Sequence, residues 1–177
     1  MTIGAKMDAK TLEAKAEEFL AQKRIAVAGV SGDSRRHPAG NAIYRRLKIG
    51  ARGVFAVNPN LESFDGDTCY PDLKSIPGGV DAVVIVTKPQ TTEEIVRQCT
   101  AAGVRRVWMH QSSARSSSVS STAVDICHRA GIDVIPGACP MMFGQNVDFG
   151  HKCMRWGLAV TGGLRIERPR GRAIRNR

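Results

Sequence analysis

The residues best suited to chemistry lie in a glycine- and serine-rich loop, residues 29–40. Gly29 and Ser31 allow backbone N–H groups to approach a phosphate, and Pro38 suits the first turn of a helix whose N-terminus favours an anion. Three neighbouring basic side chains would add charged donors: Arg35, Arg36 and His37. We therefore interpret this loop as an anion site rather than as a structural turn with surface arginines.

The spacing in this loop argues against a nicotinamide dinucleotide. A dinucleotide loop reads G-x-G-x-x-G, whereas this chain has Gly29, Ser31 and Ser34. An acidic residue about 20 positions onward would bind the ribose hydroxyls, but Asn58-Pro59-Asn60 stands there. A phosphate-rich ligand held by arginines stays open. An NAD(P) oxidoreductase stays as an alternative in which Arg35 and Arg36 would bind a 2′-phosphate, although they lie in the wrong loop for that role.

Three further loops carry polar or reactive residues. Thr87-Lys88-Pro89 offers a lysine that either reaches a phosphate or is simply exposed before a helix. His110 and Gln111 are polar candidates, while the nearby Trp108 is more typical of core packing. Cys139 could be a reactive thiol that forms a mixed disulfide with a ligand thiol, but a small buried hydrophobe is the favoured interpretation.

Alternating apolar runs and helical patterns must position these loops. We predict strands at residues 24–29, 53–57, 81–86, 105–109 and 132–135. Helices are predicted over 11–22 with Asp8 as cap, over 38–49, over 91–102 with a Thr91–Glu94 capping box, and around 123–130. Residues 152–160 fit a helix or a strand. Strand–helix repeats closed by Gly50, Gly103 and Gly131 are typical of parallel crossover units.

The fold class that follows is a three-layer, Rossmann-like, doubly wound α/β sheet of about five parallel strands in the order 3-2-1-4-5. Ligands bind such sheets beyond the carboxyl ends of the strands, where the strand order reverses. That rule places the predicted crevice between the first and fourth strands. The serine run, residues 112–121, is interpreted as a solvated loop and helix cap.

Composition limits the function classes. The 177 residues carry a net charge of +10, and the last 13 hold six Arg and one Glu, which is half of the excess. Only 5% of residues are aromatic, so nucleic-acid binding through this tail is the third alternative and a solvated tail is favoured. The five cysteines have no Cys-x-x-Cys spacing, which disfavours a disulfide framework and a zinc site. Cys139, His151 and Cys153 could be drawn as a metal site, but we do not favour that interpretation. We find no secretory signal or membrane span and expect a cytoplasmic protein.

Taken together, the loops resemble the small CoA-binding proteins of the succinyl-CoA synthetase α-subunit type. The similarity spans about residues 22–142 and rests on the segments Ala28-Gly29-Val30-Ser31 with Gly40, Val57-Asn58-Pro59-Asn60, Cys69-Tyr70-Pro71-Asp72-Leu73, Asp81-Ala82-Val83, Thr87-Lys88-Pro89, Val107-Trp108 and Cys139-Pro140-Met141. His110 stands where the family commonly has Gln, and Gln111 follows it. The histidine that the ligase phosphorylates belongs to a second domain, so the resemblance implies no ligase activity.

The resemblance implies a site for CoA or an acyl-CoA. Around the phosphates it places Gly29, Val30, Ser31, Arg35, Arg36, His37 and Gly40. Asn58 and Pro59 would border the adenosine, with Thr87, Lys88 and Pro89 opposite and His110 on the far side. A carboxylate after the second strand would repel a phosphorylated ribose, which agrees with its absence.

We accordingly expect a protein that binds a small CoA ligand without catalysis of its own. The expected organisation is an N-terminal helix within residues 1–22, a CoA-binding domain over 23–142, a C-terminal extension over 143–164 and a flexible arginine-rich tail over 165–177. Neither a membrane nor a nucleic acid is expected as a partner, and the oligomeric state stays open.

Overall fold

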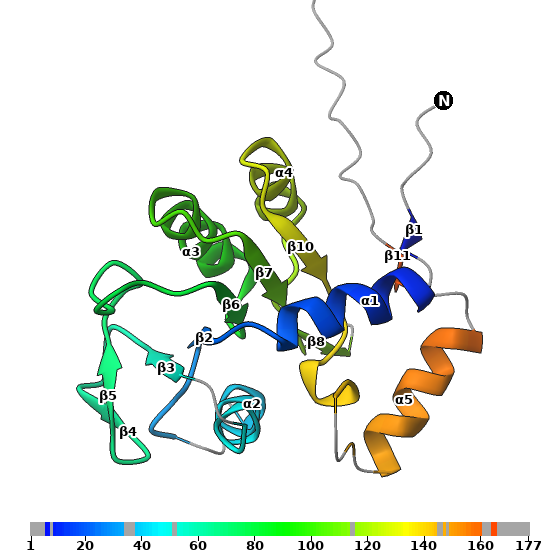
Figure 1. Cartoon of the computed structure of the whole chain (residues 1–177), viewed down its shortest axis with the longest axis horizontal. Helices are drawn as coiled ribbons and strands as arrows, with labels where there is room; N and C mark the ends of the chain where they lie inside the picture. The colour runs from blue at the N-terminus through cyan, green and yellow to red at the C-terminus, as the bar shows by residue number, and fades with distance from the viewer. Residues whose placement is uncertain are drawn as a thin grey trace, which may run out of the picture.

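A seven-stranded sheet forms the centre of the structure, a computed structural model that describes residues 6–7, 9–33, 38–50, 53–113, 116–144, 147, 149–160 and 164–165 (Figure 1). The five predicted strands are confirmed as β2 (Arg24–Ala28), β3 (Gly53–Val57), β6 (Ala82–Ile85), β7 (Arg106–Met109) and β10 (Asp133–Pro136). They are all parallel. A hairpin of β4 (Ser63–Phe64) and β5 (Asp67–Tyr70) extends the sheet beyond β3, with β5 parallel to β3.

The predicted strand order is wrong. The sheet runs β10-β7-β6-β2-β3-β5-β4, so the five predicted strands follow the order 2-1-3-4-5 rather than 3-2-1-4-5. All four residues of β6 are buried, which fits its central place between β2 and β7, whereas β3 begins exposed. The order therefore reverses between β2 and β6, and the crevice expected between the first and fourth strands moves to that pair.

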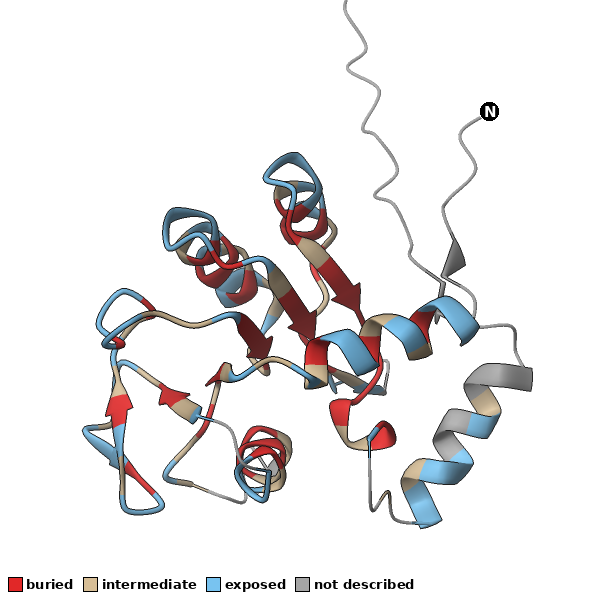
Figure 2. Ribbon diagram, viewed as in Figure 1, coloured by how far each residue is buried: buried red, intermediate tan, exposed pale blue. Residues whose placement is uncertain are grey.

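Helices cover both faces of the sheet (Figure 1). One face carries α1 (Ala9–Leu20), α2 (Pro38–Lys48) and the short 3-10 helix η1 (Pro140–Met142), and the other carries α3 (Pro89–Ala101) and α4 (Ser121–Arg129). The strands β2, β6, β7 and β10 are buried along almost their whole length, as Figure 2 shows. This double burial is why β6 and its neighbours are apolar at successive positions.

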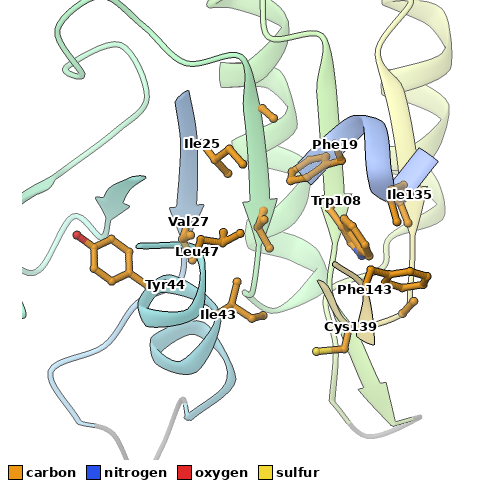
Figure 3. Packing of buried hydrophobic residues seen from close by; sticks show 14 of the residues in the cluster. Phe19, Ile25, Val27, Ile43, Tyr44, Leu47, Trp108, Ile135, Cys139 and Phe143 are labelled. Carbon is orange, nitrogen blue, oxygen red and sulfur yellow. The ribbon is translucent and has the colours of Figure 1, made fainter. Parts of the chain in front are cut away.

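Trp108 is a core residue, as its sequence context indicated. Its ring lies edge-on to Phe19 at 5.3 Å between centroids and tilted against Phe143 at 5.6 Å (Figure 3). The indole N–H donates to the carbonyl of Gly137 at 2.9 Å. Trp108 therefore joins α1 and the segment after β10 to the sheet, and its polar atom is satisfied inside the protein.

The ends of the helices follow their local sequence. Gly103 and Gly131 adopt φ values of 69° and 68° after α3 and α4, which confirms two predicted left-handed helix ends. The Thr91–Glu94 capping box is wrong, because α3 begins earlier, with Lys88 as N-cap and Pro89 in the first turn. Ser120 caps α4 by accepting a hydrogen bond from the N–H of Ala123. The predicted cap Asp8 lies outside the described residues.

Several short strands were not predicted, and for residues 152–160 the structure decides between the helix and the strand that the sequence left open. The serine run contains β8 (Gln111–Ser113) and β9 (Ser116–Ser117), and Ser118 and Ser120 are buried, so it is not simply a solvated loop. Residues 149–160 form helix α5 (Phe149–Val160), and β1 (Lys6–Met7) pairs with β11 (Leu164–Arg165). The tail beyond residue 165 lies outside the described residues. None of the described helices has the length and apolar character needed to cross a membrane.

Candidate ligand-binding site

Two glycines allow the backbone after β2 to pack directly against the backbone of neighbouring segments. Gly29 has a φ of 114°, and a Cβ built there would lie 2.3 Å from the carbonyl oxygen of Val86. A Cβ built on Gly40, in the first turn of α2, would lie 2.3 Å from the carbonyl oxygen of Gly29. The start of α2 therefore sits directly on the end of β2, where any side chain would force the two apart.

Two amide side chains hold the backbone of this loop. Asn41 is 2% exposed, accepts from the N–H of Ser31 at 2.8 Å and donates to the carbonyl of Ser31 at 2.8 Å. Asn58, which follows β3, donates to the carbonyl of Val30 at 2.6 Å and accepts from the N–H of Asn60 at 2.8 Å. The turn is thus fixed by both α2 and the neighbouring strand, so its shape does not depend on a ligand.

Asn41 was missed by the sequence analysis. The available signal was a polar residue in the first half of α2, two positions before buried Ile43. A buried amide at such a position requires partners for its donors and acceptor. In this structure those partners are the backbone atoms of the loop itself.

The end of β6 forms the other side of the loop. Ala28 pairs with both Val57 and Ile85, so the segments beginning at Gly29, Asn58 and Val86 leave the same edge of the sheet as neighbours. Lys88 is exposed there as the N-cap of α3, while Pro89 opens that helix. Thr87 and Thr92 share a hydroxyl hydrogen bond of 3.1 Å, and Thr92 also donates to the carbonyl of Lys88. Lys88 is therefore a cation placed beside the glycine loop.

The structure brings together most of the predicted site residues. It places Gly29, Val30, Ser31, Gly40, Asn58, Pro59, Thr87, Lys88 and Pro89 at this shared edge, around the ends of β2, β3 and β6. His110 follows β7, one strand farther from β2. The basic trio Arg35, Arg36 and His37 lies outside the described residues.

His110 is a buried imidazole near His151, which in turn lies beside Cys139. It is 2% exposed, and within the described part of the chain its Nε2 has no hydrogen-bond partner. Burial, together with the nearby His151, lowers its pKa from 6.5 to about 4, so the ring is neutral at physiological pH. Cys139 is 4% exposed, and its Sγ lies 3.9 Å from Nε2 of His151 on α5. Across the described ranges, no three His, Cys, Asp or Glu side chains converge as metal ligands.

An apolar groove of about 420 Å³ runs between α1, α2 and η1, on the same face as Trp108. It is lined by Glu17, Leu20, Ala21, Ile43, Arg46, Leu47, Ile49, Gly50, Pro140, Met141, Phe143 and Gly144. Sequence analysis missed the groove because three segments far apart in the chain build it. Its one local signal is Ile49, a large apolar side chain that is 75% exposed.

Comparison of the chain with known proteins identifies its family. Residues 23–145 match the model of a family described as the CoA binding domain. The chain belongs to this CoA-binding domain family. The match agrees with the resemblance found in the loops and begins one residue before β2.

Known relatives include longer enzymes and a small protein. The chain is 25% identical to acetate–CoA ligase (ADP-forming) I of Archaeoglobus fulgidus and 28% identical to the α subunit of acetate–CoA ligase (ADP-forming) II of Pyrococcus furiosus, over 74% and 68% of its own length. These matches cover only 20% and 27% of the two relatives. A solved structure of a hypothetical protein from Pyrococcus horikoshii is 28% identical, with a TM-score of 0.67 over 80% of this chain and 94% of that one.

Proposed function

We propose that this chain binds coenzyme A, free or acylated, at the edge formed by the ends of β2, β3 and β6. The diphosphate lies against the backbone of Gly29, Val30 and Ser31 at the start of α2. The observation that carries the proposal is the close backbone packing at Gly29 and Gly40: a Cβ on Gly40 would meet the carbonyl of Gly29, and a Cβ on Gly29 would meet the carbonyl of Val86. The N–H groups of Gly29 and Ser31 already donate to Val57 and Asn41. The first turn of α2, held close to this backbone, is therefore where an anion would find the N–H groups of a helix N-terminus.

The residues beside the loop suit CoA better than a dinucleotide. Asn58, rather than a carboxylate, follows β3, and its amide is already engaged with the carbonyl of Val30. A carboxylate at that point would bind the free ribose hydroxyls of NAD and repel the 3′-phosphate of CoA. Lys88, exposed on the other side of the loop, supplies a cation for a phosphate group.

We propose binding rather than catalysis. The chain spans about a fifth to a quarter of the length of the curated relatives it matches, so the ligase activity in their names belongs to those longer proteins. A fold that binds a cofactor does not by itself carry the reaction of a relative.

Calorimetry and thermal melting with CoA, NAD and NADP test this proposal. CoA at ~100 times its Kd should stabilise the fold by about 2.7 kcal/mol and raise the Tm by several degrees, whereas NAD and NADP should not. Lys88→Gln should weaken CoA binding by about three- to tenfold, because one charge-assisted contact is lost. Lys23→Gln is the matched control, since Lys23 is exposed just before β2, at the opposite edge of the sheet. A Tm shift with NADP alone would refute the proposal.

A further inference from the structure

The first observation is a buried polar atom that needs a partner. Nε2 of His110 is unpartnered within the described residues, and the side chain is 2% exposed. Such an atom is costly to bury unless something else completes its hydrogen bond. Because side chains alternate along a strand, His110 faces the same side of the sheet as Trp108, which is the side of η1 and Cys139.

The position of His110 suits the far end of a ligand held at the glycine loop. β7 lies two strands from β2, a distance of about 10 Å at the usual strand spacing. The pantetheine arm of CoA, extended from a diphosphate at Gly29, is long enough to reach His110. An acyl-CoA carries a thioester carbonyl at this end of the arm, where free CoA carries only a thiol.

The protonation state of His110 favours a neutral partner. With its pKa lowered to about 4, the ring donates a hydrogen bond as an uncharged imidazole. The titratable group near it is His151 from α5, which in turn lies beside Cys139, after β10. A carbonyl oxygen accepts from such a ring without bringing a second charge into a buried place.

The second observation is the apolar groove, which begins next to this point. Pro140 and Met141 line it and directly follow Cys139. Figure 3 shows Cys139 with its sulfur toward the side of α2, where Ile43 lies, and Ile43 is also a groove residue. From Ile43 to Leu47 the wall extends about 6 Å at the rise of an α-helix, and Ile49 continues it past the end of α2. The groove therefore offers a hydrocarbon chain far more contact than an acetyl group could use.

The charges of the groove also select its occupant. Its two charged lining residues, Glu17 and Arg46, have opposite signs, so neither an anionic nor a cationic chain gains a net attraction. The remaining lining is largely aliphatic or aromatic. An uncharged hydrocarbon chain is the occupant that this surface fits best.

We propose that the site takes acyl-CoA thioesters with a hydrocarbon acyl chain, whose carbonyl accepts from Nε2 of His110 and whose chain lies in the groove between α1, α2 and η1. This inference rests on the proposed binding of CoA. It adds the substrate class, which the glycine loop alone does not specify.

Calorimetric titrations with CoA, acetyl-CoA and octanoyl-CoA test the inference. Octanoyl-CoA should bind about tenfold or more tightly than CoA, because several methylene groups leave water. Ile49→Gln combined with Met141→Gln should remove most of that advantage and leave the Kd for CoA unchanged. Phe149→Gln is the matched control, because Phe149 is an equally exposed apolar residue, on α5 and outside the groove.

A separate comparison tests the carbonyl contact. His110→Leu should weaken acetyl-CoA relative to CoA, whereas His110→Gln, which keeps an N–H donor, should preserve the ratio. Circular dichroism establishes that each variant folds. If the affinity for acetyl-CoA falls relative to that for CoA in both variants, or in neither, the role given to His110 is overturned.

The outcomes separate the two proposals. Equal affinity of the wild type for CoA and octanoyl-CoA overturns the acyl-chain inference and leaves CoA binding intact, whereas no binding of any CoA species refutes the proposed function itself. Sedimentation of the same variants tests whether a second copy of the chain occupies the groove instead. A dimer that the Ile49 and Met141 substitutions dissociate, without any octanoyl advantage, would make the groove an interface between copies and overturn the inference.

Discussion

Individual side chains determine the shape of the loop before any ligand arrives. Asn41 from α2 and Asn58 from the segment after β3 hold the backbone of Ser31 and Val30 through hydrogen bonds. A preformed loop spends little of the binding free energy on ordering itself. His110 is a second such side chain, because it is a buried neutral ring whose charge state responds to pH.

Asn41→Ala should weaken both the fold and the site. Removal of the amide breaks two hydrogen bonds to Ser31, which we expect to cost about 2 kcal/mol of unfolding free energy. The affinity for CoA should fall about tenfold, since the loop is no longer fixed. Urea unfolding and calorimetry measure the two effects. Asn60→Ala is the control, because Asn60 is exposed and contributes only its backbone N–H to Asn58; an equal loss in that variant would contradict the account.

His110 should make the stability depend on pH between about 6.5 and 4. The folded-state pKa of about 4 lies below the ordinary value of 6.5, so the unfolded chain binds more protons in this window. The free energy of unfolding is therefore full above pH 6.5 and falls as the pH drops toward 4, by at most about 3 kcal/mol. Melting curves of His110→Gln should show a flatter decline. His128→Gln, at an exposed position on α4, should behave as the wild type, and parallel curves for all three proteins would refute this assignment.

Elements position these residues through close backbone packing. The first turn of α2 rests on the end of β2 because Gly29 and Gly40 lack side chains, and β6 supplies the other wall through Val86. The same edge of the sheet also receives the start of α3 at Lys88 and Pro89. The site is thus a property of how three strand ends meet two helix starts.

Gly40→Ala should separate α2 from β2. The new methyl group would meet the carbonyl oxygen of Gly29 at 2.3 Å, and such overpacking typically costs about 1–3 kcal/mol. CoA affinity should fall below the limit of calorimetric detection, while circular dichroism still reports the fold. Gly32→Ala offers a matched change in the same loop, since its Cβ would lie 3.4 Å from a Leu61 methyl group. Equal CoA affinity of Gly40→Ala and wild type would show that the close contact is not needed for binding.

Sequence predicted the elements better than their arrangement. Runs such as 82–86 are apolar at every position, as a strand covered on both faces requires, so the strands and the loop after Gly29 were predictable. Strand neighbours were not, because β6 pairs with β2 through hydrogen bonds of the backbone, which every residue offers. The partners of Asn41 and the groove beside Met141 likewise depend on segments far apart in the chain.

Two properties of the whole molecule bear on binding: its net charge and the order of its strands. Its charge of +10 attracts a polyanion from a distance, although half of that excess belongs to residues 165–177. The strand order reverses between β2 and β6, and ligands of such sheets bind at this reversal, beyond the carboxyl ends of the strands. Recognition of the ligand therefore belongs to the sheet edge, and the tail contributes only long-range attraction.

Titration of isotope-labelled protein with CoA, followed by backbone amide NMR, tests the central claim most directly. The account predicts that the largest shift changes fall on Val30, Ser31, Gly40 and Lys88, with residues 165–177 nearly unchanged at 0.15 M salt, where exposed charges are screened beyond about 8 Å. The largest changes in the tail, or at the opposite edge of the sheet near Lys23 and Gly53, would contradict it.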